Sequence, residues 1–140
     1  MKLHIIARGK IGRCPEAELI ERYAKRMTWP FAVTELPDTG GKAVPIGPNT
    51  RIIALDERGE QLGSVDLAAL LERWRDDGVR ETRFLIGAAD GLTKAEQQSA
   101  DWMISFGKAT WPHMLVRAML TEQLYRATTI IAGHPYHREG

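Results

Sequence analysis

Two short apolar runs separated by a helical pattern constrain the fold of this chain more than any other feature. The runs are RIIAL at residues 51–55 and TRFLI at residues 82–86. Between them, apolar side chains recur at helical spacing from Leu67 to Trp74, opposite a charged face. Continuous apolar strands are typical of parallel sheets covered on both faces. The pattern therefore predicts an α/β fold with a mostly parallel sheet flanked by helices.

The remaining elements extend the same alternation along the chain. We expect further strands at residues 3–7, 31–36 and 102–106, a turn at residues 56–59, and a proline- and glycine-rich loop at residues 37–49. Four helices are expected from residues that favour helix ends: Pro15 and Pro30, Ser64 as an N-cap and Gly78, the Thr93–Glu96 capping box, and Pro112 and Gly133. This order fits a single domain over residues 1–140.

Composition excludes several classes of protein. Apolar residues make up 44% and charged residues 26% of the 140, as in folded globular chains. No uncharged apolar stretch approaches the ~20 residues of a membrane span, and no secretory signal is apparent, so we expect a cytoplasmic protein without membrane contact. Cys14 is the single cysteine, which excludes an internal disulfide and a multi-cysteine metal site. Dinucleotide, phosphate-loop and serine-hydrolase motifs are missing.

The charge distribution limits how the chain could recognise a nucleic acid. The net charge is +1, from 19 basic and 18 acidic residues. Residues 1–50 carry 8 basic and 5 acidic residues, whereas residues 51–100 carry 7 basic and 10 acidic residues. Tight binding through many phosphates needs a larger basic excess, and DNA is not an expected partner. An RNA partner would have to be recognised by a local patch, by shape, or by two chains together.

Three expected strand ends have a composition that suits a ligand site. Open α/β sheets bind ligands outside the carboxyl ends of their strands. Glycine there lets a ligand approach the backbone closely, and apolar side chains beside exposed backbone groups suit a flat uncharged ring such as adenine. The alternative explanation is that these residues simply end each strand and begin a loop. The candidate ligand-binding residues are Leu55, Gly87, Phe106, Gly107, Lys108, Ala109, Thr110 and Trp111.

The C-terminal tail, residues 134–140, concentrates side chains that can act on RNA. His134, Tyr136, His137 and Arg138 lie within five positions. Arginine binds phosphate, while tyrosine and histidine can stack on an extruded base. A frayed terminus is the ordinary alternative. Pro135 breaks any helix between the two histidines, so we expect no metal site there.

The longest expected helix carries charges of its own and a broad apolar arc. Its charged residues are Arg117, Glu122 and Arg126. Glu122 and Arg126 have the spacing of a favourable i,i+4 ion pair, and a solvated face is the ordinary explanation for these charges. Its apolar side chains cover more of the helix than one small domain buries, and a dimer partner would cover the rest. These apolar residues are Leu115, Met119, Leu120, Leu124, Ile130 and Ile131.

The chain resembles a known family along essentially its whole length. The resemblance rests on five motifs: WPHMLVRAMLTEQLYRA at residues 111–127, HPYHRE at 134–139, MKLHIIARGK at the start, ERYAKR at 21–26 and LIGAADGL at 85–92. They resemble the RlmH family, the large-subunit ribosomal RNA pseudouridine N3-methyltransferases of the SPOUT superfamily. The family commonly has Gly-Gly-Pro-x-Gly where this chain has GAADG at residues 87–91, and the loop at residues 37–49 is short for the family.

The resemblance implies both a fold and an activity. The fold would be a SPOUT-type sheet with a deep C-terminal trefoil knot, an exception to the rule that chains are unknotted. The cofactor would be S-adenosyl-L-methionine, and the enzyme a homodimer with each active site at the subunit interface. The substrate would be N3 of a pseudouridine, position 1915 of 23S rRNA, within the assembled 70S ribosome.

Residue roles carry over from the same resemblance. Leu55, Gly87 and the segment 106–111 match the family's cofactor contacts. Tyr136, His137 and Arg138 match the tail involved in substrate binding and catalysis, with His137 as the first candidate for general base and Arg138 as a stabiliser of negative charge. A non-catalytic ribosome-binding protein that retains the fold is the alternative. An enzyme acting on transfer RNA would show a stronger basic face or an added domain.

Overall fold

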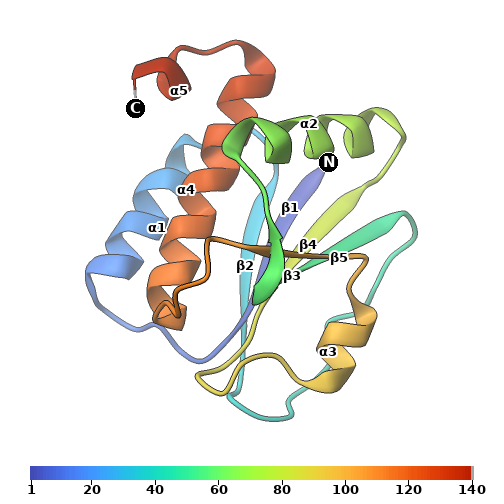
Figure 1. The fold of residues 1–140 in the computed structure, drawn as a ribbon, viewed down its shortest axis with the longest axis vertical. Coiled ribbons are helices and arrows are strands. Elements are labelled where there is room, and N and C mark those ends of the chain that lie inside the picture. Colours follow the sequence, from blue (N-terminus) through green and yellow to red (C-terminus); the bar gives the residue numbers. More distant parts are fainter. Residues whose placement is uncertain (140) are drawn as a thin grey trace.

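The computed structural model describes residues 1–139 and contains one five-stranded sheet (Figure 1). The strands are β1 (Lys2–Arg8), β2 (Phe31–Leu36), β3 (Thr50–Gln61), β4 (Glu81–Ile86) and β5 (Trp102–Ser105). Their order is β2-β1-β4-β3-β5, and all four pairings are parallel. The predicted α/β fold with a parallel sheet is therefore confirmed.

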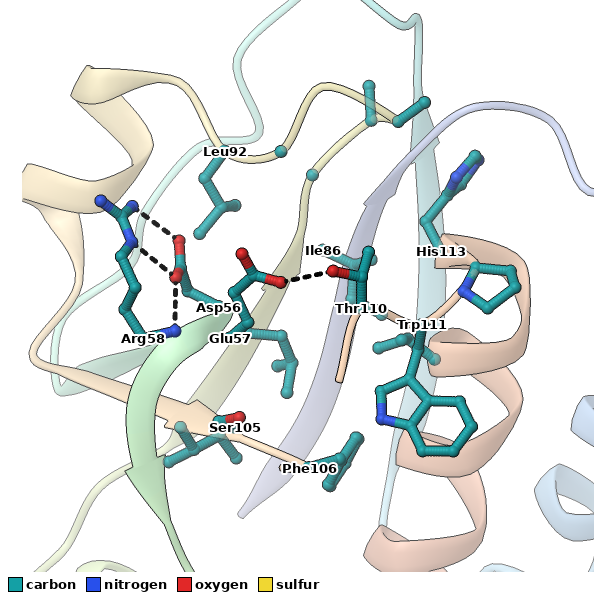
Figure 2. Close-up of a pocket in the computed structure, with 18 of the residues that line it drawn as sticks. Asp56, Glu57, Arg58, Ile86, Leu92, Ser105, Phe106, Thr110, Trp111 and His113 are labelled. Atoms are coloured by element: carbon teal, nitrogen blue, oxygen red, sulfur yellow. Dashed lines mark hydrogen bonds and ion pairs between the residues drawn. The ribbon is translucent and has the colours of Figure 1, made fainter. Parts of the chain in front are cut away.

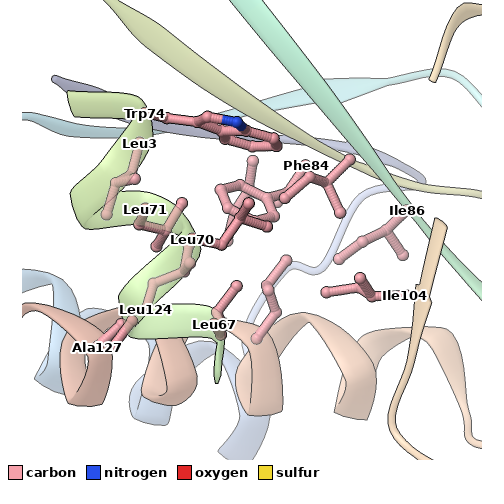
Figure 3. Close-up of a cluster of buried hydrophobic side chains, with 14 of the residues drawn as sticks. Leu3, Leu67, Leu70, Leu71, Trp74, Phe84, Ile86, Ile104, Leu124 and Ala127 are labelled. Carbon is pink, nitrogen blue, oxygen red and sulfur yellow. The ribbon is translucent and has the colours of Figure 1, made fainter. Parts of the chain in front are cut away.

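Helices cover one face of the sheet closely. The helices are α1 (Pro15–Arg26), α2 (Ser64–Asp76), α3 (Lys94–Ser99), α4 (His113–Ala132) and α5 (Tyr136–Glu139). Helices α1 and α2 both pack against α4, and α3 lies apart from these three (Figure 1). The main core lies between this helical layer and the sheet, where Leu71, Phe84 and Leu124 are fully buried (Figure 3).

The opposite face of the sheet is covered by loops rather than by long helices. Ile6, Ile52, Ala54 and Leu85 form a second, smaller cluster there. The predicted loop at residues 37–49 covers part of it, and Val44 packs against the cluster. Arg83 fixes this loop by donating hydrogen bonds to the carbonyl oxygens of Val44, at 3.0 Å, and Pro45.

The expected turn at residues 56–59 is wrong, because β3 continues through it to Gln61. Leu55 and Glu60 both pair with Ile104 of β5, so the residues between them form a bulge in a continuous strand. Gly59 is needed there, since a Cβ atom would lie 2.7 Å from backbone atoms of Ile104. Polar residues and a glycine, typical of a turn, here mark a close approach of two strands.

Two helix ends and one side chain also differ from expectation. The N-cap of α2 is Gly63 rather than Ser64, because the Ser64 hydroxyl donates to Gln123 on α4, at 2.7 Å. Helix α1 ends at Arg26, before Pro30, because Met27 adopts extended backbone and packs on the main core. Arg117 is fully buried and does not lie on a solvated face. The capping box at Thr93 and the left-handed Gly133 at the end of α4 are confirmed.

Candidate active site

A cavity of about 770 Å³ opens at the carboxyl edge of the sheet, where β4 and β5 end and β3 bulges (Figure 2). We call it the edge pocket. Its volume lies in the range of small-molecule sites. Seven of the eight candidate ligand-binding residues line it, and Lys108 does not. The seven are Leu55, Gly87, Phe106, Gly107, Ala109, Thr110 and Trp111.

Gly87 is needed because the chain folds back against it. Residues 88–91 form a tight turn in which the Gly91 amide donates to the Ala88 carbonyl oxygen at 2.8 Å. A Cβ atom on Gly87 would lie 2.4 Å from the carbonyl carbon of Gly91. The glycine therefore makes room for this turn and not directly for a ligand. The Ala-Ala-Asp sequence, which replaces the family's Gly-Pro pattern, still closes the turn.

The 106–111 segment is held in place by short hydrogen bonds. Gly107 has φ +121°, which favours glycine, and no atom would meet a Cβ there within 4 Å. The Ser105 hydroxyl accepts from the Gly107 amide at 3.0 Å and donates to its carbonyl oxygen at 2.6 Å. The Thr110 hydroxyl donates to the Glu57 carboxylate at 2.9 Å, which ties this segment to the β3 bulge (Figure 2).

Carboxylates at the β3 bulge make the rim of the edge pocket partly acidic. Asp56 and Glu57 both line it. The Arg58 side chain donates to both oxygens of Asp56, at 3.0 and 2.9 Å. These hydrogen bonds are the main reason why the pKa of Asp56 lies below its ordinary value, so Asp56 stays ionised. Sequence reasoning missed both carboxylates because it assigned them to a turn that leaves the sheet.

A buried arginine anchors α4 beside the edge pocket. Arg117 is 1% exposed and donates to the Glu35 carboxylate at 2.6 Å and to the Gly9 carbonyl oxygen at 3.0 Å. Glu35 also accepts from the Ile11 amide at 2.8 Å. Burial alone would raise the pKa of Glu35, but the hydrogen bonds from Ile11 and Arg117 outweigh it and lower the pKa. The cluster joins the ends of β1 and β2 to α4.

The C-terminal tail is ordered as the short helix α5 and packs on the end of α4. The Tyr136 hydroxyl donates to Glu122 at 3.2 Å, and the ring of Tyr136 lies edge-on to that of Tyr125, with centroids 4.8 Å apart. Arg126 donates to Glu122 at 2.8 Å and contacts His137 Nδ1 at 3.0 Å. The predicted Glu122–Arg126 ion pair is confirmed, and the frayed-terminus alternative does not describe residues 134–139.

The tail follows the C-terminal end of α4 (Figure 1), whereas the edge pocket lies at the N-terminal end of this helix. Pro112 and His113, at the start of this helix, line the edge pocket. Tyr136 contacts Glu122 and His137 contacts Arg126, nine and thirteen residues further along the helix than His113. At 1.5 Å per residue, these contacts lie about 14 and 20 Å from the start of the helix. The structure therefore brings the candidate cofactor residues together but leaves Tyr136, His137 and Arg138 far from them.

Two adjoining hollows of about 360 and 250 Å³ connect these regions along the outside of α4. We call them the outer groove. Phe106, Met119 and Gln123 line both hollows, and Phe106 also lines the edge pocket. At the other end of the groove, Glu122 belongs to the tail contacts. The predicted apolar arc of α4 is thus partly open to solvent at Leu115 and Met119.

Within residues 1–139, no three histidine, cysteine, aspartate or glutamate side chains converge in a way that could hold a metal ion. The His134 ring accepts a hydrogen bond from the Tyr136 amide at 3.1 Å. Among the helices of the described chain, none is long and apolar enough to cross a membrane.

The sheet is parallel and a small-molecule pocket lies at its carboxyl edge. These two features place the protein among the α/β proteins that bind ligands beyond their strand ends. The family described as "Predicted SPOUT methyltransferase" matches residues 1–137. The chain belongs to this SPOUT methyltransferase family and, within it, to the ribosomal RNA large subunit methyltransferase H (RlmH) family.

Two similar curated relatives cover the whole chain. A ribosomal RNA large subunit methyltransferase H from Rhizorhabdus wittichii is 64% identical over 140 residues, and one from Novosphingobium aromaticivorans is 67% identical over 141 residues. In both cases the match covers 100% of this chain and 100% of the relative.

A solved structure supports the fold. The SpoU methyltransferase AviRb from Streptomyces viridochromogenes, crystallised in complex with its cofactor AdoMet, superposes with a TM-score of 0.52 at 12% identity. The match covers 91% of this chain but only 57% of the AviRb chain.

Proposed function

We propose that this protein transfers a methyl group from S-adenosyl-L-methionine to N3 of a pseudouridine in 23S rRNA of the assembled ribosome. Support comes from the family, from relatives named as ribosomal RNA large subunit methyltransferases, and from the position of the edge pocket. Action on ribosomes implies a cytoplasmic enzyme. The trefoil knot and the modification site implied by the family resemblance stay predictions.

The edge pocket fits the proposed cofactor. Accessible backbone along residues 106–111, beside apolar side chains such as Leu55 and Ile86, suits an adenine ring. Asp56 and Glu57 place negative charge at the rim, which suits a ligand that carries a sulfonium and an ammonium group. When bound, the cofactor supplies an electrophilic methyl group. The chain then has to exclude water and orient the base nitrogen toward that group.

The separation between the tail and the edge pocket of one chain is the observation that supports a dimeric active site. A tail whose contacts lie about 14 to 20 Å along α4 from the edge pocket cannot reach the methyl group of a cofactor bound in its own chain. Two copies that lie antiparallel along the outer groove would bring the tail of one to the edge pocket of the other. The groove ends at Phe106 on one side and at Glu122 on the other. We therefore propose a homodimer with two composite active sites.

Mixed dimers test this arrangement directly. Ala109→Trp should block cofactor binding, because Ala109 lines the edge pocket and its exposed position tolerates a larger side chain. Arg138→Ala should remove a tail donor and leave cofactor binding intact. Each homodimer should be inactive, measured as methyl transfer from labelled S-adenosylmethionine to ribosomes that lack the modification. Doubly tagged heterodimers should recover about half of the wild-type rate, because one of their two sites is intact.

The mixed-dimer experiment has clear contrary outcomes. If tail and edge pocket acted within one chain, each heterodimer subunit would carry one defect and no activity would return. A monomeric wild-type protein that transfers methyl groups would likewise reject the composite site. Binding of S-adenosylmethionine by calorimetry without any methyl transfer to ribosomes would favour the non-catalytic alternative.

A further inference from the structure

The contact between Arg126 and His137 determines where the imidazole proton lies. The Nη1 atom of Arg126 is 3.0 Å from Nδ1 of His137. A guanidinium group carries only donors and stays protonated in proteins. Nδ1 must therefore accept, so the proton of the neutral ring is on Nε2. A doubly protonated ring would place an N–H group against the guanidinium, so it is incompatible with this contact.

The surroundings fix Arg126 as well as its partner. Its Nε atom donates to Glu122 at 2.8 Å, and its guanidinium lies 4.9 Å from the centre of the Tyr136 ring. The Arg126 and Glu122 side chains are 13% and 19% exposed, so solvent screens the pair only in part. The Tyr136 hydroxyl closes the network by donating to Glu122 at 3.2 Å.

Tyr136 does not supply a base in place of His137. Burial, then hydrogen bonding with Tyr23 and the nearby Glu122 charge, raise the pKa of the Tyr136 hydroxyl well above its ordinary value. It stays protonated and acts as a donor. Arg138 is an obligate donor as well. Each of the three tail residues expected to be catalytic is thus a hydrogen-bond donor in this arrangement.

We propose that Arg126 is a positioning residue that holds His137 as its neutral Nε2–H tautomer, so that His137 donates a hydrogen bond to the substrate base. This inference rests on the proposed function and changes the role expected for His137. With Nδ1 occupied and Nε2 protonated, His137 has no free lone pair and cannot remove the N3 proton as a general base.

Donors suit the chemistry of the substrate. N3 of pseudouridine lies between two carbonyl groups, and negative charge that develops at N3 spreads onto both oxygens. Donors from His137 and Arg138 would stabilise that charge. The N3 proton passes to water, the nitrogen electron pair forms the bond to the methyl carbon, and the electron pair of the broken sulfur–carbon bond stays on sulfur.

Nitrogen NMR of the intact protein tests the tautomer. Long-range proton–nitrogen spectra of the ¹⁵N-histidine-labelled wild-type protein should show a protonated Nε2 and an unprotonated Nδ1 for His137, assigned by its loss in His137→Gln. Arg126→Lys keeps a donor and should keep this pattern. Arg126→Met has similar length without a donor and should give mixed tautomers. Arg22→Met, on the exposed face of α1, is the matched control and should change nothing.

Kinetics complete the test. Arg126→Met should lower kcat for ribosome methylation on the order of 10²-fold with unchanged cofactor affinity, and Arg126→Lys should recover most of the rate. A wild-type His137 protonated at Nδ1, or equal activity of the Lys and Met variants, would overturn the inference. Wild-type protein with the expected tautomer but no methyl transfer would instead overturn the proposed function, so the two failures are distinguishable.

Discussion

Helix α4 carries two arginines with different surroundings, Arg117 beside the edge pocket and Arg126 beside the tail. Arg117, beside the edge pocket, is 1% exposed and binds Glu35 and backbone carbonyl groups from another part of the fold. Arg126, beside the tail, is 13% exposed and binds Glu122 one turn earlier, together with His137. The first joins the helix to the sheet, and the second holds side chains of the tail.

This difference shows which part of the site a single chain can complete. The edge pocket is built on the sheet edge and on a helix anchored by the buried Arg117, so it is formed within one copy. The tail is held by partly exposed contacts with Glu122 and Arg126, away from the edge pocket of its own chain. Four predictions, in order of decreasing expected effect, test this comparison.

Gly87→Val should abolish cofactor binding at the edge-pocket end. The new Cβ atom would lie 2.4 Å from the Gly91 carbonyl carbon, so the turn at residues 88–91 could not close. Calorimetric titration with S-adenosylmethionine should show no binding. Gly47→Val is the matched control, because no atom lies within 4 Å of the corresponding Cβ position. Normal binding by Gly87→Val would mean that this turn does not shape the site.

Arg117→Met should cause the largest loss of stability among the α4 arginines. It removes a buried guanidinium and leaves the Gly9 carbonyl and the partly exposed Glu35 carboxylate without this donor, at a cost of about 2 kcal/mol in the free energy of unfolding. Urea denaturation measures the change. A loss no greater than that of Arg22→Met would show that these hydrogen bonds of Arg117 do not anchor the helix.

Acid should weaken the same anchor through Glu35. Because the folded-state pKa of Glu35 is lowered, its stabilisation is present above the unfolded-state pKa and is lost as pH falls through the folded-state value. The effect should be roughly 1 kcal/mol or less, since the Glu35 side chain is 34% exposed. Denaturation at a series of acidic pH values should show a shallower dependence for Glu35→Gln than for the wild type.

Arg126→Met should have the smallest effect on stability. Its ion pair with Glu122 joins residues one helical turn apart and is partly exposed, so its loss should lower the free energy of unfolding by about 0.5 kcal/mol. Urea denaturation of the Arg126 and Arg117 variants side by side gives the comparison. A loss as large as that of Arg117→Met would show that the tail network is part of the structural core.

Much of the fold and of the edge pocket could be predicted from the sequence. The apolar runs at residues 51–55 and 82–86 locate two neighbouring strands, and Gly87 marks the end of β4, because local patterns and parallel topology determine that edge. The role of Gly87 could not be predicted correctly, since its reason is the approach of Gly91, four residues later in a turn. Asp56 and Glu57 were missed because a bulge resembles a turn in sequence.

The α/β class of the chain, the order of its elements and its family resemblance follow from the amino-acid sequence, as do most candidate residues of the edge pocket. These depend on periodicity, helix-end signals and motifs, which are local properties. The burial of Arg117, the contact of Arg126 with Nδ1 of His137, and the separation of tail and edge pocket along α4 became apparent in the folded structure. Burial and side-chain pairing depend on which distant segments pack together, and no local pattern encodes that.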